Sequence, residues 1–363
     1  MKLQVTQENL NRALGTVARV ANSRGTLPIL SNILVKTVNN RLSIAATNLD
    51  IAITHYIGAK VGDEGSVTVP ARLMQDFVGS LPAGVIELEL EETKLHITTD
   101  QYKSVVNGIG ADEFPVMPAI EGGKSWKISG TVLKRALQQV IFAASADESR
   151  PVLTGVLLQS VDGGLFMAAT DSYRLAEKSL GTSTQEVQLL VPATAMHDLL
   201  RIVSDFEDDV KVTHDDQQVL FQVGDVDLVA RLIDGNYPDY RKLIPSEFAV
   251  EALIKRADLL NVTKVSSLFA RESAGSITIQ VDEKAGTLSI HSIASQLGEN
   301  TATADGKISG DGQITLNSRY LLDALHALSG DDVSFCFNGK LEPTLIKDPA
   351  GSDYLHIIMP LKS

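Results

Sequence analysis

The sequence is poor in several features, and each shortage excludes a class of protein. It has one cysteine, Cys336, among 363 residues, which excludes a disulfide within the chain and a cysteine metal cage. No run approaches the roughly eighteen apolar residues of a membrane-spanning helix. The first ten residues, MKLQVTQENL, lack the apolar core of a signal peptide. We therefore expect a cytoplasmic protein that does not span a membrane.

Recognisable motifs of catalysis and metal binding are also missing. The histidines form no HExxH or other metal spacing, and the chain has no GxxxxGK[ST] phosphate loop and no GxSxG elbow. We expect no catalytic residue, no metal and no cofactor, and hence a binding or scaffold role. An enzyme that assembles its site from dispersed residues, such as Asp171, Asp234, Asp239 and His197, is an alternative.

What the sequence does contain is an internal repeat. Its landmarks recur after 122 or 123 residues: Thr47 with Thr170, Val69-Pro70 with Val191-Pro192, and Phe114-Pro115 with Tyr237-Pro238. A weaker third copy follows, in which the LSI of residues 288–290 matches that of residues 42–44. Three units of about 120 residues would fill the chain, as repeated supersecondary units do. One duplicated pair followed by an unrelated third domain is the alternative.

Each unit has the pattern strand, helix, strands, helix, strands, which indicates an α+β fold with two helices packed on antiparallel sheets. The predicted helices cover residues 7–24, 71–80, 131–145, 193–204, 254–271 and 318–329. Thr6, Pro70 and Asn317 are typical helix-start residues. Breaker residues after Phe114-Pro115 mark a boundary. The predicted domains are residues 1–121, 122–246 and 247–363.

Charge is unevenly distributed along the chain. The net charge of −13 and pI of about 5.0 argue against nucleic acid as a partner. The six predicted helices, however, hold 12 basic and 5 acidic residues, a net charge of +7. A basic helix layer beside an acidic sheet layer would attract phosphate without reading bases. Ordinary solvated helix faces are the alternative.

Five motifs give the chain a family resemblance over its full length. They are TLPILSNILV (26–35), VPAR (69–72), ATDSYRLA (169–176), DGNYPDYRKLIP (234–245) and MPLKS (359–363). In their order and spacing the chain resembles the bacterial DNA polymerase III beta subunits, the sliding clamps. The resemblance implies three clamp-fold domains per chain and a head-to-tail dimeric ring, with helices lining the hole and sheets outside.

The resemblance also implies a peptide-binding groove between the second and third domains, here called the partner groove. The matching positions are mostly apolar with a polar fringe, which suits a short peptide with leucine or phenylalanine anchors. They are Leu153, Thr170, Ser172, Tyr173, Arg174, Leu175, Pro238, Lys242, Leu243, Asn317, Tyr320, Leu341, Pro343, Ile357, Met359, Pro360 and Leu361. The family often has Gly-His at Ser172-Tyr173 and arginine at Lys242.

Two further sets of residues complete the expected sites. For DNA, Arg24 matches a family contact and Arg150 is expected beside the partner groove. The predicted helix faces add Arg12, Arg19, Lys134, Arg135, Arg201, Lys264 and Arg319. For the dimer interface, the resemblance indicates Leu73 and the strand at residues 103–107, including Ser104, against Leu268 and Phe269.

The expected function is therefore that of a processivity factor and not of an enzyme. A homodimeric ring would encircle double-stranded DNA without sequence preference and tether the replicative polymerase alpha subunit through the partner groove. The clamp-loader complex would open the ring, and other polymerases and repair proteins with clamp-binding peptides would share the groove. A peptide-binding scaffold of the same fold that never holds DNA is the other alternative.

Overall fold

The computed structural model describes residues 1–21, 27–120, 122–206, 208–296, 298–351 and 353–361. The chain divides into two compact units. Unit 1 comprises Met1–Thr131 and Asp198–Leu232, and unit 2 comprises Val132–His197 and Ile233–Ser363. Among the described residues, no helix is long and apolar enough to cross a membrane.

Unit 1 contains two antiparallel sheets. In spatial order, the five-stranded sheet consists of β5 (Lys60–Asp63), β1 (Lys2–Thr6), β7 (Val85–Glu91), β8 (Lys94–Thr98) and β9 (Lys103–Asn107). The eight-stranded sheet consists of β10 (Lys124–Ile128), β15 (Val210–His214), β16 (Gln218–Val223), β17 (Val226–Arg231), β4 (Ile51–Gly58), β3 (Arg41–Thr47), β2 (Asn32–Val38) and β6 (Ser66–Pro70). The β17–β4 pair joins strands from the predicted first and second domains.

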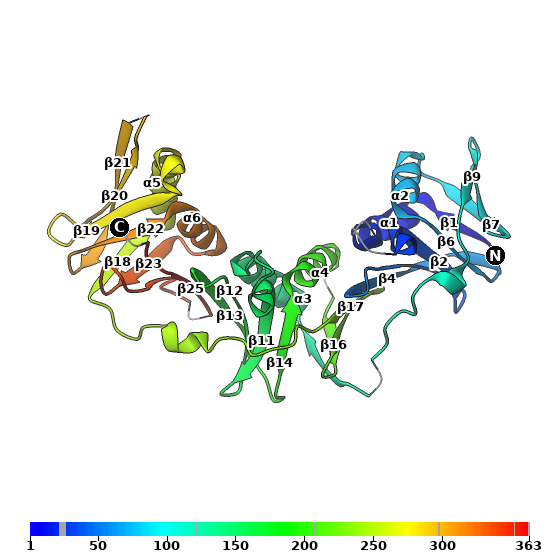
Figure 1. Ribbon diagram of the computed structural model, residues 1–363, viewed down its shortest axis with the longest axis horizontal. Coiled ribbons are helices and arrows are strands. Elements are labelled where there is room, and N and C mark those ends of the chain that lie inside the picture. Colours follow the sequence, from blue (N-terminus) through cyan, green and yellow to red (C-terminus); the bar gives the residue numbers. More distant parts are fainter. Residues whose placement is uncertain (22–26, 121, 207, 297, 352, 362–363) are drawn as a thin grey trace. The chain divides into compact units, whose positions relative to one another are not determined.

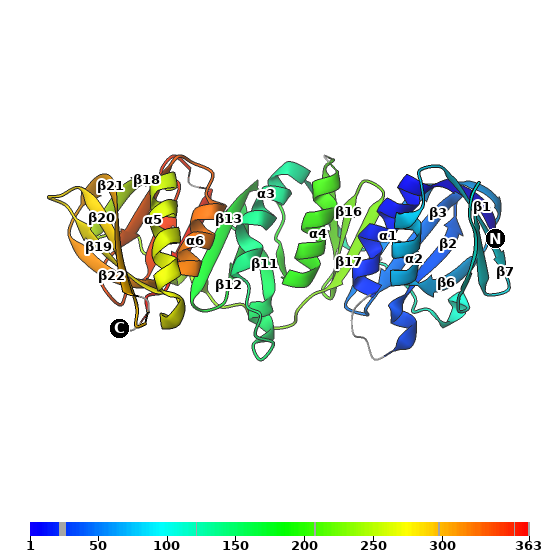
Figure 2. The same cartoon turned by 90° about the horizontal axis from the view of Figure 1, so that it is seen from above.

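Two helices of unit 1, α1 (Gln7–Ala21) and α2 (Ala71–Ser80), lie side by side (Figure 2). The apolar face of α1 includes Leu10, Leu14 and Val17, which are fully or almost fully buried, and α1 packs against β3 and β4. Arg12 and Arg19 are exposed on the same helix. This division follows from apolar residues at helical spacing, because burying one stripe leaves the opposite face in solvent.

Unit 2 is built on one twelve-stranded antiparallel sheet. Its strands are, in spatial order, β14 (Gln188–Pro192), β11 (Gly155–Val161), β12 (Gly164–Thr170), β13 (Arg174–Thr182), β25 (Tyr354–Ile358), β24 (Thr344–Lys347), β23 (Asp332–Phe337), β18 (Val250–Lys255), β21 (Gly298–Ser309), β20 (Thr287–Ala294), β19 (Ser276–Asp282) and β22 (Gly312–Asn317). The β13–β25 pair joins strands from the predicted second and third domains. Cys336 is buried, as expected from its alternating strand.

The helices α5 (Arg256–Phe269) and α6 (Ser318–Ala327) lie side by side within unit 2 (Figure 1). Asn317 caps α6, as predicted, because its side-chain oxygen accepts hydrogen bonds from the N–H groups of Arg319 and Tyr320. The division between the units falls inside α3 (Gly130–Val140) and α4 (Ala193–Asp205). Short 3-10 helices lie at η1 (Pro28–Ser31), η2 (Ala111–Glu113), η3 (Ile141–Ala143), η4 (Pro151–Thr154), η5 (Tyr240–Leu243) and η6 (Arg271–Ser273).

Several predicted helix limits were too generous. The structure confirms the limits of the helix at residues 71–80, and it describes α1 as far as Ala21, with residues 22–24 of the predicted first helix outside the described residues. Lys255 ends strand β18 and Arg271 lies in η6, although both were placed in the predicted helix at residues 254–271. The error at Lys255 arises because β18 runs directly into α5 without a side-chain cap to mark the change. The domain limits at residues 121 and 246 stay a prediction.

The repeat is confirmed at atomic detail in two turns. In the first copy, the Asn48 carboxamide oxygen accepts from the N–H groups of Asp50 (3.0 Å) and Ile51 (2.8 Å). In the second, the Asp171 carboxylate accepts from those of Tyr173 (2.9 Å) and Arg174 (3.0 Å). The hydroxyl of the threonine before each turn donates to the carbonyl oxygen of the residue four positions later, from Thr47 to Ile51 and from Thr170 to Arg174. The same hydrogen bonds at equivalent positions show that the two turns are structural copies of each other.

Candidate functional site: a clamped arginine above an apolar floor

The site in unit 2 begins at the turn between β12 and β13. Asp171 closes this turn by accepting the two N–H groups described above, and Ser172 has a φ of 77°. A positive φ favours glycine, since glycine has no Cβ to clash. This explains why the resembling family often has glycine at this position. The turn leaves Tyr173 prominent, with 61% of the residue exposed.

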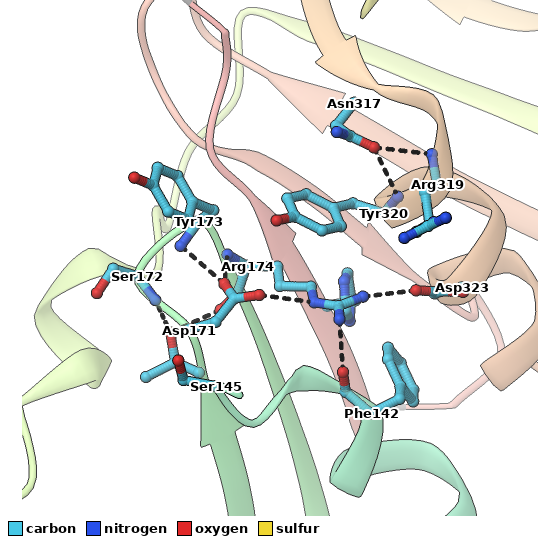
Figure 3. A network of polar contacts seen from close by, with 12 residues as sticks. Phe142, Ser145, Asp171, Ser172, Tyr173, Arg174, Asn317, Arg319, Tyr320 and Asp323 are labelled. Atoms are coloured by element: carbon cyan, nitrogen blue, oxygen red, sulfur yellow. Dashed lines mark hydrogen bonds and ion pairs between the residues drawn. The ribbon is translucent and has the colours of Figure 1, made fainter. Parts of the chain in front are cut away.

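The side chain of Arg174 is held on three sides (Figure 3). Its guanidinium donates to Asp171 (3.1 Å), to Asp323 on α6 (2.6 Å) and to the carbonyl oxygen of Phe142 (2.6 Å). Its carbon Cζ lies 4.5 Å from the centre of the Tyr320 ring. Arg174 therefore ties β13 to α6 and fixes Tyr320, which the sequence predicted for the partner groove.

Replacing Arg174 by isoleucine should lower the free energy of unfolding of unit 2 by about 3 kcal/mol, since two carboxylates lose their cation. The first copy of the repeat suggests a variant that should restore this stability, because it has Asn48 and Ile51 at the positions that Asp171 and Arg174 occupy in the second copy. Adding Asp171→Asn and Asp323→Asn should recover most of the loss. Urea unfolding followed by circular dichroism tests this, and an unchanged single variant or an unrescued triple variant would contradict it.

Beneath the turn lies an apolar floor made of side chains from both predicted domains of unit 2. Its buried members are Leu157, Ala168, Leu175, Leu190, Tyr240, Cys336, Leu345 and Ile357, and Met359 packs against them. The Tyr240 hydroxyl donates to Glu177 (2.5 Å), and Arg241 forms an ion pair with the same carboxylate (2.9 Å). This clamp anchors the segment that carries Lys242 and Leu243.

His356 is a fully buried titratable group on β25, where it alternates with Leu355 and Ile357 and so faces the side of the sheet opposite the floor. Its ring stacks on Phe142, with centroids 5.6 Å apart, and its Nδ1 lies 3.3 Å from the Tyr354 hydroxyl. Burial, with a further contribution from the positive charge of Arg174, lowers the pKa of His356 to about 3. The ordinary histidine pKa of about 6.5 applies to the unfolded chain.

Acid should therefore weaken unit 2 through His356. Below about pH 6.5 His356 is protonated in the unfolded chain, whereas in the folded chain it is not protonated until about pH 3. The free energy of unfolding therefore decreases as the pH is lowered across that window. By pH 4.5 the loss is about 3 kcal/mol. His356→Phe keeps a ring against Phe142 and should flatten this dependence, measured as urea midpoints at pH 7 and pH 4.5. An equally steep fall in the variant would contradict the assignment.

The described part of unit 2 contains every predicted residue of the partner groove. Leu153, Thr170, Leu175 and Ile357 are buried, and Arg174, Asn317, Tyr320, Pro343, Met359, Pro360 and Leu361 are half-buried. Ser172, Tyr173, Pro238, Lys242, Leu243 and Leu341 are exposed. Lys242 pairs with Asp239 at 2.7 Å. We call the buried members the base of the predicted groove and the exposed members its rim.

Some residues of the site did not stand out in the sequence. Phe142, Glu177 and Asp323 contribute through contacts with residues far away in the chain, such as Asp323 with Arg174, 149 positions apart. No local pattern marks such a pair. The basic and aromatic residues at positions 237–242 were the sequence feature that could have indicated the contact of Tyr240 and Arg241 with Glu177.

The predicted DNA-contacting residues lie on several elements. Arg12, Arg19, Arg135, Arg150, Arg201, Lys264 and Arg319 are exposed and Lys134 is half-buried, while Arg24 lies outside the described residues. Arg201 pairs with Asp198 (3.1 Å), and Arg150 donates to Ser172 (3.3 Å), which is one of the residues predicted for the partner groove. Within the observed limits, the six described α-helices hold nine basic and six acidic residues, a net charge of +3. The value differs from the expected +7 because Lys255 and Arg271 lie outside the helices, Asp205 lies within α4, and Arg24 is not among the described residues.

The predicted interface residues occupy both units. In unit 1, Leu73 is 52% exposed on α2 and Ser104 is half-buried on β9. In unit 2, Leu268 is 50% exposed and Phe269 half-buried at the end of α5. Both leucines are therefore accessible to another protein surface.

Comparisons with known proteins agree with this architecture. The family models of the DNA polymerase III beta subunit match in chain order: the N-terminal domain at residues 1–118, the central domain at 127–239 and the C-terminal domain at 241–362. The third match excludes an unrelated third domain. The chain is 32% identical to the beta sliding clamp of Synechococcus elongatus and 30% identical to that of Bacillus subtilis, with 100% of this chain and at least 99% of each relative covered.

Solved structures show the same likeness. The Bacillus subtilis DNA polymerase sliding clamp has a TM-score of 0.95 at 28% identity, and the Thermotoga maritima DNA polymerase III beta subunit has 0.93 at 25%. Each comparison covers 100% of this chain and 99% of the solved chain. The repeat, the three matched domains and the full-length relatives lead to one conclusion: the chain belongs to the DNA polymerase III beta subunit family, the beta sliding clamps, and is a non-catalytic processivity subunit with three clamp domains.

Proposed function

We propose that two copies of this chain close head to tail into a ring around duplex DNA in the bacterial cytoplasm. The partner groove would bind clamp-binding peptides of the replicative polymerase alpha subunit, the clamp-loader complex, and other polymerases and repair proteins. Each peptide contact can be weak, since tethering raises the effective concentration of the partner to the millimolar range. The domains would be residues 1–121, 122–246 and 247–363.

The observation that carries the peptide proposal is a rigid apolar base with an exposed apolar rim. Leu175 and Ile357 are at most 3% exposed, whereas Tyr173, Leu243 and Leu341 are 55% to 68% exposed. Soluble proteins seldom present such side chains together without a partner. The Arg174 network fixes the base before binding, which reduces the entropy lost on association.

Two strand edges support the head-to-tail ring. Strand β9, which contains exposed Val105 and the predicted contact Ser104, is an end strand of its sheet. Residues 298–305 of β21 pair with β20, while β18 pairs only with residues 306–309, so in the described ladders this stretch has one free side. Free strand edges can accept another strand. One free edge and one exposed leucine in each of the first and third predicted domains suit a heterologous contact made twice.

The DNA contact that we propose is sparse and depends on salt. Arg24, Arg150, Arg12, Arg19, Lys134, Arg135, Arg201, Lys264 and Arg319 would meet phosphates without reading bases. The helix charge of only +3, within a chain of −13, limits the attraction. Weak contact suits a ring that must slide, because topology and not affinity would hold it on DNA.

Native mass spectrometry with a synthetic pentapeptide carrying leucine and phenylalanine anchors tests stoichiometry and groove together. We expect a dimer, twice the chain mass of 39.0 kDa, that takes up two peptides. The same peptide with both anchors changed to alanine is the control and should not bind. A monomer, or equal uptake of both peptides, would contradict the proposal.

A further inference from the structure

Unit 1 contains a structural copy of the partner groove. In unit 2, β13 and β25 place Leu175 opposite Ile357, and in unit 1, β4 and β17 place Ala52 opposite Val229. Ala52 and Leu175 are one repeat period of 123 residues apart, and in each unit the next strand pairs with them in the same antiparallel way. The copy therefore includes the second strand of the groove as well as its turn.

One backbone hydrogen bond aligns the two copies to single residues. In unit 2 the N–H of Met359 donates to the carbonyl oxygen of Tyr173 at 2.8 Å. In unit 1 the N–H of Arg231 donates to the carbonyl oxygen of Asp50 at 2.9 Å. Arg231 thus stands where the partner groove has Met359, and Asp50 stands where it has Tyr173.

A cavity of about 180 Å³ lies at this place in unit 1. It is lined by the copied turn, by the end of β17 with Arg231, and by the segment with Pro115 and Val116. Pro115 is the repeat counterpart of Pro238, a rim residue of the partner groove. Leu49 is 48% exposed and Val116 is 96% exposed. The cavity has room for one large apolar side chain and little else.

Its charge differs from that of the partner groove. Arg231 is exposed, and among the described residues its guanidinium has no ion-pair partner. An acidic group on a ligand would supply that partner with a charge-assisted hydrogen bond. Where the partner groove presents the thioether of Met359, this copy presents a cation beside apolar Leu49 and Val116.

We propose that this unit 1 pocket is a second peptide-binding site, which takes one leucine or phenylalanine side chain of an extended peptide and pairs Arg231 with a neighbouring aspartate or glutamate. The inference rests on the proposed peptide-binding role of the partner groove, of which the pocket is a copy. A single anchor predicts weak binding by itself. For a partner already held at the partner groove, the second contact would add avidity.

Photo-crosslinking of the full-length protein tests the proposal. The probe is acetyl-Ala-Glu-Bpa-Ala-amide, where Bpa is benzoylphenylalanine, used at millimolar concentration, and mass spectrometry locates the attachment. We expect attachment near residues 47–52 or 115–118 as well as in the partner groove. Arg231→Glu should reduce unit 1 attachment about tenfold, and a probe with lysine in place of glutamate should restore it in that variant.

A second variant separates the two sites. Met359→Ala with Leu361→Ala should remove attachment at the partner groove and leave attachment in unit 1. Attachment in the partner groove alone, or a unit 1 yield that does not respond to Arg231→Glu, would overturn the second site. Attachment in unit 1 without any in the partner groove would instead overturn the proposed function, so the two failures are distinguishable.

Discussion

Replacing Met359 and Leu361 together by alanine is expected to weaken binding of the polymerase alpha subunit peptide at least about a hundredfold and to leave the dimer intact. Met359 packs against the apolar floor, and both side chains are half-buried. Truncating central apolar anchors in a binding site typically costs several kcal/mol in total. The fold should survive, because the N–H groups of both residues keep their backbone partners, Tyr173 and Thr315.

Fluorescence anisotropy with a labelled peptide measures the affinity, and sedimentation measures the dimer. The matched control, Val85→Ala with Val132→Ala, truncates two exposed apolar side chains that are not among the predicted groove residues and should bind normally. An unchanged affinity would contradict the groove assignment. Loss of the dimer would contradict it as well, since the groove and the dimer interface are proposed to be separate.

The second large effect concerns ring closure. Leu73→Asp and Leu268→Asp each place a charge at a half-exposed leucine, one in each unit. In a head-to-tail dimer, each variant alone damages both interfaces, so each should be monomeric. An equal mixture should form dimers again, since one interface of the mixed pair is then entirely native and the other carries both substitutions.

This mixture gives a result that other arrangements do not. The mixed dimer should be open, with the mass of a dimer but without retention on circular DNA. An isologous contact predicts something else, because one of the two variants would remain dimeric alone and mixing would restore nothing. Native mass spectrometry of the two variants and of their mixture distinguishes these cases.

The sequence predicted the local devices of the fold better than the contacts between distant residues. The spacing of Thr47 and Thr170 identified the duplicated turn, and Asn317 was identified as a cap, because a turn or a cap depends on a few neighbouring residues. Helix ends were less certain, since Lys255 continues a strand without any capping side chain. That error enlarged the predicted basic surplus of the helices.

The candidate site was predictable in its members but not in how they are held. The resemblance identified Arg174 and Tyr320, yet the carbonyl of Phe142 and the carboxylate of Asp323 reach the guanidinium only through the fold. The presence of Ser172-Tyr173 where the family often has Gly-His also has a physical consequence. Ser172 keeps the left-handed φ of the turn, and Tyr173 adds an exposed ring to the rim.

Retention on plasmid DNA tests the central claim most directly. The protein is loaded onto nicked circular plasmid by a clamp-loader complex, separated from free protein at high salt, and counted before and after one restriction cut. A closed ring should stay on the circle and slide off the linear ends, so nearly all protein should be lost on cutting. Equal retention on circular and linear DNA would mean that affinity holds the protein, and no retention on either would favour a scaffold that never encircles DNA.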